Sequence, residues 1–317
     1  MKAIKKSKIL VMNAALLGMV AFSACNVNDG IEDGNQPQAV RFSAGIANQA
    51  VQNDAPITKA AGTIWASGDA IGVFMVEKGM TTIAENAVNR QYTTTGNSTF
   101  TTASGQDIYY PMDGSAVDFI AYYPYATGKA ISDQLSVNVS GAQTAASQAA
   151  IDLLWAKANN NGSGYTKATP NVALSFDHKL SKIVMNVKAA ANVNASLTGM
   201  TVSIGYMNTE NTFNLSTGTF GTPGTPAAIT PCKLATAKTG FDASYDAVIL
   251  PGTYPDGMVT VTFTVGGEPF VWKIPATTFN SGAEYTYAIT LTRTEVKVTG
   301  TIKPWAAGPN NLTGEAE

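Results

Sequence analysis

Apolar and polar residues alternate with a period of two in many short segments of this 317-residue chain. The first such segment has apolar residues at Val40, Phe42, Ala44 and Ile46. The same pattern recurs at residues 71–75, 117–123, 183–187, 259–265, 270–274 and 285–291, and then at Val296 and Val298. Strands that bury one face show this alternation, and turn pairs such as Pro-Gly and Gly-Gly separate the segments. We therefore predict an all-β protein, with one helical segment near residues 145–154, where Ala and Gln are frequent.

The first 24 residues have the pattern of an export signal. Four lysines precede an apolar stretch at residues 9–22, which ends in Ser23-Ala24-Cys25. A basic start, a short apolar run and small residues at the end are typical of secretory signals. The cysteine at this position resembles a bacterial lipoprotein signal, in which Cys25 becomes the acylated first residue, although Phe22 stands where Leu, Val or Ile is usual. The alternative is an ordinary secretory signal with an incidental cysteine.

Residues 25–39 are predicted to be a flexible acidic tether. They contain few apolar side chains, so they cannot bury enough surface to order themselves. An acidic cluster, Asp29, Glu32 and Asp33, follows the candidate lipid site closely. This cluster resembles the acidic export signals that send lipoproteins of the Bacteroidota to the cell surface.

Composition limits the class of partner. Hydrophobic residues make up 45% of the chain and charged residues only 13%, about half the usual share. Loss of the four lysines of the signal takes the formal net charge from −2 to −6. Because no basic excess is available to neutralise phosphates, we exclude nucleic acid as a main partner.

Two polar stretches interrupt the strand pattern. The run Asn-Asn-Asn-Gly-Ser-Gly at residues 159–164 lies between two strand-rich halves, and it predicts a domain boundary at 165/166. A long hairpin loop is the alternative. Residues 217–231 contain three prolines and are expected to form a loop within the second half.

Motifs for chemistry are absent from the sequence. It has no phosphate-binding glycine motif, no nucleophile elbow and no metal-binding Cys or His pair. His178, the single histidine, alternates with Phe176 and Leu180, so we expect a structural role on a strand face. Cys232 and one histidine cannot form a zinc site without several carboxylates. We predict no catalytic residue, no metal and no cofactor, although dispersed carboxylates of a hydrolase stay open because such partners meet only in the fold.

Two aromatic clusters have two interpretations. Tyr109-Tyr110-Pro111 and Tyr122-Tyr123-Pro124-Tyr125 could form a stacking platform for sugars. Aromatic residues are also common on strands, where one face packs into the core. We favour the core interpretation.

Seven segments occur in a fixed order behind the signal, at residues 41–44, 58–60, 65–74, 109–111, 117–124, 152–156 and 176–183. Together they resemble the fimbrillin (Mfa-like) family of the Bacteroidota, the subunits of type V pili. The resemblance implies two tandem transthyretin-like β-sandwich domains, here residues 40–165 and 166–317. It also implies a non-enzymatic lipoprotein of the outer membrane surface and of the fimbrium, whose partners are other pilus subunits bound by donor-strand exchange. Host or bacterial surface ligands are candidate further partners.

In that family an Arg- or Lys-specific protease removes the N-terminal strand, and a strand of the next subunit fills the groove that is left. By resemblance, Val40, Phe42, Ala44 and Ile46 form the candidate removable strand, since they have the alternation that such an exchange requires. Lys59 and Arg41 are the candidate processing residues. We prefer Lys59 because it follows the strand, although arginine is the commoner choice in the family; an uncut, permanent strand is the alternative.

The C-terminal region leaves the place in a pilus open. Residues 296–302 alternate apolar and polar side chains and fit either a donor segment or the last strand of the second domain. A stalk, a tip and an anchor subunit all stay possible. The rival from another class is a monomeric surface lipoprotein that binds glycans through its Tyr and Trp clusters.

Overall fold

The computed structural model describes residues 36–47, 64–193, 196–293 and 296–304, the last range partly by backbone alone. The chain divides into two compact units, residues 1–36 and 37–317, and every described strand belongs to the second unit. Strands dominate that unit, which confirms the all-β prediction. In the described ranges no helix has the length and apolar character needed to cross a membrane.

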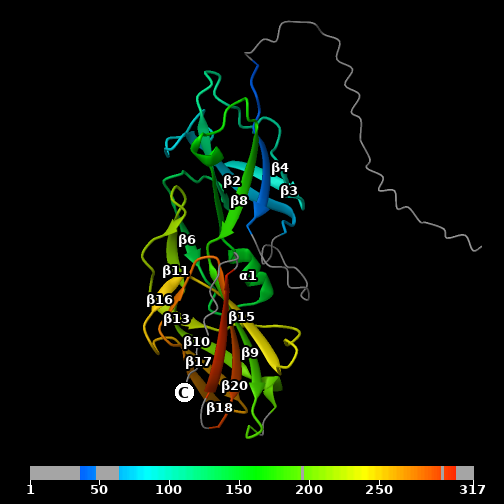
Figure 1. Ribbon diagram of the computed structural model, residues 1–317, viewed down its shortest axis with the longest axis vertical. Helices are drawn as coiled ribbons and strands as arrows, with labels where there is room; N and C mark the ends of the chain where they lie inside the picture. The colour runs from blue at the N-terminus through cyan, green and yellow to red at the C-terminus, as the bar shows by residue number, and fades with distance from the viewer. Residues whose placement is uncertain (1–35, 48–63, 194–195, 294–295, 305–317) are drawn as a thin grey trace, which may run out of the picture. The chain divides into compact units, whose positions relative to one another are not determined.

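Seven strands close into a barrel in the order β1-β4-β3-β2-β5-β7-β8, with β8 returning to β1 (Figure 1). Their bounds are β1 Arg41–Ile46, β2 Ser67–Glu77, β3 Arg90–Thr95, β4 Thr99–Thr101, β5 Val117–Tyr123, β7 Leu154–Ala158 and β8 Asn171–His178. A ring with an odd number of strands cannot alternate direction throughout, so at least one pair must be parallel. That pair is β1 and β8, whereas β1 and β4 are antiparallel. The barrel takes β8 from beyond residue 165, and the predicted boundary at 165/166 stays a prediction.

The remaining strands form four sheets. Their orders are β14-β15-β9-β20-β21, β13-β10-β17-β18, β12-β11-β6 and β16-β19. The strands of the first two sheets are β9 Ser181–Ala189, β10 Thr201–Asn208, β13 Pro226–Ile229, β14 Cys232–Lys233, β15 Ala243–Ile249, β17 Thr260–Val265, β18 Glu268–Lys273, β20 Ala283–Leu291 and β21 Val296–Pro304. The smaller sheets contain β6 Gln134–Asn138, β11 Glu210–Asn214, β12 Thr219–Phe220, β16 Gly252–Tyr254 and β19 Thr277–Phe279. β12 and β13 lie within residues 217–231, so the expectation of a loop there was wrong in part.

One α-helix, α1 (Ala145–Ile151), lies in the segment predicted to be helical. It begins at Thr144, whose hydroxyl accepts from the Ser147 amide while the Ser147 hydroxyl accepts from the Thr144 amide. This capping box satisfies amides that the first helical turn leaves unpaired. Two short 3₁₀ helices, η1 Asn160–Gly162 and η2 Leu197–Gly199, complete the described elements.

Three hydrophobic clusters form the core. One fills the barrel, and a second joins inward residues of the four- and five-stranded sheets. The third lies on the outer face of β2 and β5 and contains Phe74, Ile120 and Tyr122 together with Leu215. Because both faces of β5 are covered, all seven of its residues are buried, and the predicted one-face alternation was wrong for this strand.

Trp155 packs beside the third cluster. Its indole N–H donates to the Leu215 carbonyl over 2.8 Å, and Lys179 Nζ lies 5.0 Å from the ring centroid. Gly218 (φ +69°) approaches the ring so closely that a Cβ would lie 2.6 Å from Cδ2. A glycine is required here both by its backbone conformation and by the space.

Candidate functional site

β1 carries three of the four residues of the predicted removable strand, Val40 directly precedes it, and all four point into the barrel. Val40, Phe42, Ala44 and Ile46 are 2–7% exposed and belong to the barrel cluster, while Arg41, Ser43 and Gly45 face outwards. Full burial of a Val, Ile or Phe side chain stabilises a fold by about 1.5–3 kcal/mol. β1 is therefore a structural part of the barrel core as well as one of its walls.

Phe42 is the aromatic member of the four, and it contacts two other aromatic rings. Its ring meets Tyr92 edge-on with centroids 4.8 Å apart, and Phe119 with centroids 5.2 Å apart. Edge-to-face pairs at these distances add about 0.5–1.5 kcal/mol each beyond area burial. The second inward position of β1 thus fills an aromatic pocket.

The backbone of β1 is paired along both sides. Its register with β8 runs from Arg41 opposite Asn171 to Ile46 opposite Phe176, and on the other side Phe42 lies opposite Phe100 of β4. The pairing extends before the strand, because the Val40 amide donates to the Ile108 carbonyl over 2.8 Å. Figure 1 shows β1, in blue, alongside β8, in green. Removal of β1 would expose two rows of backbone groups and the apolar channel between them, which is the geometry that strand addition needs.

Trp65 completes the contacts of β1 next to Ser98, the residue that precedes β4. The Ala44 amide donates to the Ser98 carbonyl over 2.8 Å, and the Ala44 carbonyl accepts from Trp65 Nε1 over 2.9 Å. Trp65 is 4% exposed. The sequence analysis did not predict that Trp65 contacts β1. The available indication was its position shortly after Lys59, in the segment that follows the removable strand.

The other predicted site residues divide into two groups. Cys25 and Lys59 lie outside the described residues. Arg41 is described: its side chain is exposed, but its amide donates to the Pro170 carbonyl over 3.0 Å within the paired strand. The backbone at Arg41 is therefore held in the barrel wall.

The aromatic clusters are mostly core. Tyr110, Tyr122 and Tyr123 are 2%, 0% and 7% exposed, whereas Tyr109 is 46% exposed. Burial raises the pKa of Tyr122 to about 12, because ionisation would place a charge in an apolar environment. The clusters thus offer one exposed ring, Tyr109, and one half-buried ring, Tyr125, on separate segments.

His178 ends β8 and is buried, as the structural interpretation requires. Its Nδ1 lies 2.8 Å from Asp152 Oδ1, and both side chains are at most 5% exposed. Burial raises the pKa of the Asp152 carboxyl even though His178 acts in the opposite direction. The pair joins the residue after α1 to the end of β8.

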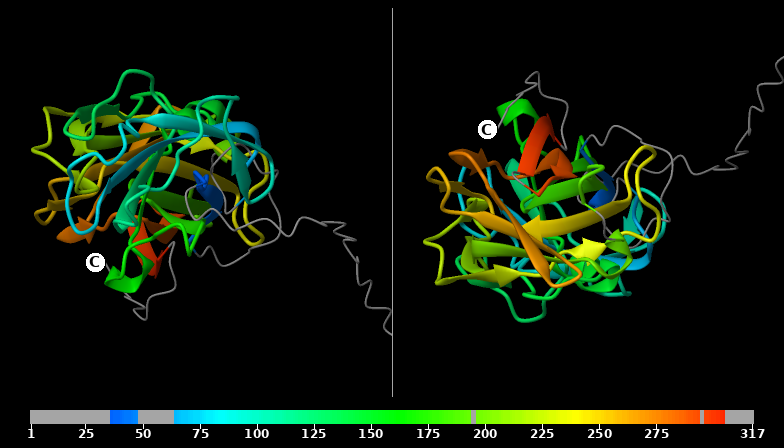
Figure 2. Two further views of the ribbon diagram at one scale, coloured as in Figure 1. Left: turned by 90° about the horizontal axis from the view of Figure 1, so that it is seen from above. Right: turned by 90° about the horizontal axis from the view of Figure 1, so that it is seen from below.

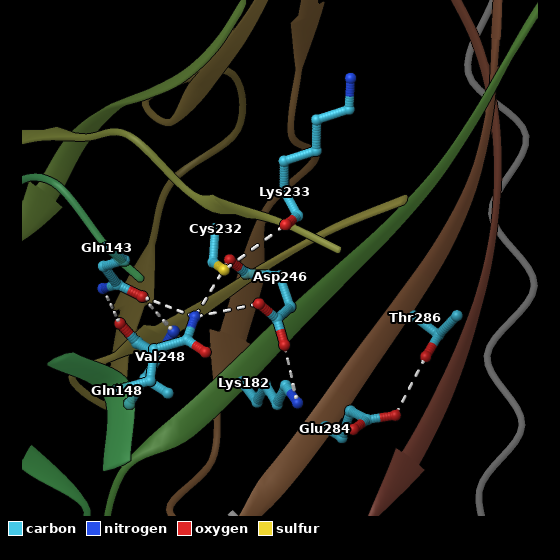
Figure 3. Close-up of polar contacts among 9 residues, drawn as sticks. All are labelled: Gln143, Gln148, Lys182, Cys232, Lys233, Asp246, Val248, Glu284 and Thr286. Carbon is cyan, nitrogen blue, oxygen red and sulfur yellow. Dashed lines mark hydrogen bonds and ion pairs between the residues drawn. The ribbon is translucent and has the colours of Figure 1, made fainter. Parts of the chain in front are cut away.

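A second polar cluster covers the edge of the five-stranded sheet at β15 (Figure 3). Gln143 uses its side-chain amide like a strand residue: Nε2 donates to the Val248 carbonyl over 2.6 Å, and Oε1 accepts from the Val248 amide over 2.8 Å. Gln148 of α1 donates to Asp246 Oδ1 over 3.0 Å. Side chains thus satisfy backbone groups that β14, with two residues, leaves uncovered.

Lys182 and Asp246 form an ion pair in the same cluster, with 2.9 Å between Nζ and Oδ2. Desolvation lowers the pKa of Lys182, but the carboxylates of Asp246 and Glu284 outweigh it and the net shift is upwards. Cys232 lies opposite Asp246 in the ladder, and burial followed by that carboxylate raises the pKa of its thiol. A raised thiol pKa disfavours the thiolate, so this cluster lacks an activated nucleophile.

A polar pocket of about 280 Å³ lies beside the start of β3. Its lining includes Arg90, Gln91, Thr93, Gln106 and Tyr125. Arg90 Nη1 donates to Gln106 Oε1 over 3.0 Å. Within the described ranges no group of three or more His, Cys, Asp or Glu side chains could hold a metal ion.

Comparison with known proteins gives a consistent family. The chain matches the fimbrillin-like family over residues 58–305. It is 35% identical to a Bacteroides uniformis protein named as fimbrium subunit Fim1C, over 96% of this chain and 97% of that protein. A crystal structure from Bacteroides uniformis, described as a cell adhesion protein, is 31% identical with a TM-score of 0.66 and covers 85% of this chain and 98% of its own. A Bacteroides ovatus structure of the same description has a TM-score of 0.65 at 22% identity, over 86% of this chain and all of its own, and it supports the fold alone.

The family is thus supported by the match over most of the chain and by relatives above 30% identity. The chain belongs to the fimbrillin-like family, a family of fimbrial structural and adhesion subunits and not of enzymes.

Proposed function

We propose that this protein is a structural or adhesive subunit of a cell-surface fimbrium that assembles by exchange of β1. The chain is exported as a lipoprotein acylated at Cys25 and is held at the outer membrane by that anchor. A protease then removes β1, and a strand from another subunit takes its place. Family membership supports the fimbrial part of the proposal.

The position of β1 in the chain supports the proposed strand exchange. β1 and the preceding Val40 supply four core side chains and two paired edges, yet they precede every other barrel strand. One cut between Ala47 and Ile64 separates it covalently and leaves β2 to β8 on one chain. An internal strand would need two cuts and would divide the barrel.

The same reasoning distinguishes the two processing candidates. A cut after Arg41 leaves Phe42, Ala44 and Ile46 attached to the barrel, so it does not release the strand. A cut after Lys59 releases all of β1. We therefore propose Lys59 as the processing residue.

The proposal retains the two-domain organisation. The domains, transthyretin-like sandwiches in the family, are divided near residues 165/166, and the first takes β8 from beyond that point. Separate hydrophobic clusters for the barrel and for the later sheets support two domains. The burial of Tyr110, Tyr122 and Tyr123 weakens the rival, a monomeric glycan binder.

The test uses the chain from Asn26 onward, treated briefly with a Lys/Arg-specific protease. The new N-terminus is sequenced, and polymers are sought as heat-labile ladders on gels and as filaments by electron microscopy. A Lys59→Gln variant is the matched control. We expect a new N-terminus at Ala60 and polymers in the parent protein and neither in the control. Persistence as an intact monomer would refute the proposal, and cutting without polymers would restrict it to a subunit that receives a strand from a different partner.

A further inference from the structure

We propose that Trp65 selects the strand that occupies the β1 position by admitting only a small residue at its third inward site. Residues 296–302, the candidate donor segment of the sequence analysis, have the matching order of side-chain sizes when aligned in the direction of β1. The inference rests on the proposed strand exchange and adds to it a selective residue, a register and a direction.

The indole ring of Trp65 belongs to the same barrel cluster as Ala44. It meets Phe100 and Phe176 edge-on, with centroids 5.1 and 5.3 Å apart. Phe100 is the register partner of Phe42, and Phe176 is the register partner of Ile46. The ring therefore occupies the space between the second and fourth inward positions, which is the space that a larger side chain at Ala44 would need.

Trp65 also fixes the register through its hydrogen bond. Nε1 donates to the Ala44 carbonyl over 2.9 Å in a buried environment. A buried donor that loses its acceptor destabilises the fold, because it has given up its hydrogen bond to water without a replacement. Any strand in this place must present a carbonyl to Nε1 and a small side chain at the same residue, so the two contacts act on one position.

The inward residues Val40, Phe42, Ala44 and Ile46 thus follow the order large, large, small, large. Residues 296–302 read Val-Lys-Val-Thr-Gly-Thr-Ile, and their alternate positions are Val296, Val298, Gly300 and Ile302. Aligned in the direction of β1, Gly300 falls at the Ala44 position. Reversed, Val298 would meet Trp65 and Gly300 would leave the aromatic pocket of Phe42 empty, so the order of sizes selects one direction.

The present position of this segment allows its transfer. β21 pairs with β20 at the end of the five-stranded sheet and with no other described strand (Figures 1 and 2, in red). Gly300 is already constrained there, because a Cβ would lie 2.9 Å from Tyr287 Cδ1. A substitution at Gly300 would therefore perturb β21 itself, and it must be tested on a separate peptide.

The first test uses the intact chain and does not depend on strand exchange. Variants Ala44→Val, Trp65→Leu and the double variant are compared by hydrogen exchange of β4 and β8. Ser43→Val adds similar bulk to the outward face as a control. We expect Ala44→Val to raise the exchange rate at least tenfold, the control to change it less than threefold, and Trp65→Leu to remove most of the Ala44→Val effect. Trp65→Phe keeps a ring but no N–H, so Ala44→Val should still raise the exchange rate in that background. An equal effect of Ala44→Val in the parent and Trp65→Leu proteins would overturn the proposal that Trp65 restricts the size of this residue.

The second test measures binding of labelled peptides to protein that has been cut after Lys59, separated from its N-terminal fragment under denaturing conditions and refolded, so that the β1 position is empty. The peptides are residues 38–47, the same with Ala44→Val, residues 296–304, and the same with Gly300→Val. We expect the two unsubstituted peptides to bind and each valine to weaken binding at least tenfold. Tighter binding of the Gly300→Val peptide would show the reverse direction and overturn the assigned one.

The two tests separate the inference from the proposed function. Failure of the 38–47 peptide to bind would refute strand exchange, whereas the intact-chain result would still decide the role of Trp65. Binding of 38–47 without binding of 296–304 would uphold exchange and refute the candidate donor segment.

Discussion

Substitution of Phe42 by alanine should open the barrel at β1. The Phe42 ring is 3% exposed and packs edge-on against Tyr92 and Phe119 at 4.8 and 5.2 Å. Truncation of a buried Phe to Ala costs about 3–5 kcal/mol, because the cavity left behind closes only in part. At about 1.4 kcal/mol per factor of ten, exchange of amides that open with the barrel should become between a hundred and a few thousand times faster.

Hydrogen exchange followed by mass spectrometry of peptides from β2, β5 and β8 measures this effect where it arises. Ser43→Ala is the matched control, since Ser43 is the neighbouring outward residue of the same strand. Peptides from β17 and β20 should change little, because they lie in a different hydrophobic cluster. An exchange rate for Phe42→Ala within fivefold of the control would show that β1 is not part of the cooperative barrel core, and would refute the reasoning.

Three further predictions concern other parts of the fold. Asp246→Leu should lower the free energy of unfolding, measured with denaturant, by about 3 kcal/mol, because it removes the ion-pair partner of the Lys182 ammonium. The double variant with Lys182→Met should recover most of that loss, and equal stability of the single and double variants would contradict this. Burial raises the pKa of Tyr122 to about 12, so its contribution to stability is complete below pH 10 and is lost as the pH rises towards 12. Tyr122→Phe should therefore lose less stability between pH 10 and pH 12 when unfolding is followed by circular dichroism, and superimposable curves for the two proteins would count against burial as the cause. Gly218→Ala should lower stability by about 1–3 kcal/mol in thermal unfolding, since its methyl group would lie 2.6 Å from the Trp155 indole ring. Gly240→Ala, with a similar φ and open space around it, should lower stability less; equal losses of stability would mean that backbone strain alone is responsible.

The sequence predicted well where one physical requirement acts on a segment. The alternation at Val40–Ile46 reflects one buried face, and the structure shows it in full. Helix α1 was predicted from local propensity and begins at a capping box that is itself local. The buried side chains of Tyr110 and Tyr122 agree with the core interpretation of the aromatic clusters.

It failed where a second, distant surface decides the outcome. Alternation was expected in β5, but Ile120 and Tyr122 pack against Leu215, almost a hundred residues later. The proline-rich stretch before Pro231 was expected to be a loop, yet β13 pairs there with β10. Gln143 shows the same limit, because nothing local to a glutamine indicates that its amide will complete the edge of β15.

If the protein assembles by the proposed strand exchange, the covalent link between β1 and β2 determines when assembly can begin. While Ala47 and Ile64 belong to one chain, β1 is present beside its own barrel at an effective concentration on the order of millimolar or more. In the proposed exchange, a strand from another subunit would be present at a far lower concentration and could not compete with it. A cut in the link leaves every contact of β1 in place but makes its return a bimolecular event, so once it leaves, dilution alone shifts the balance towards the incoming strand. Proteolysis would thus act as a timing step that changes molecularity without changing the interface.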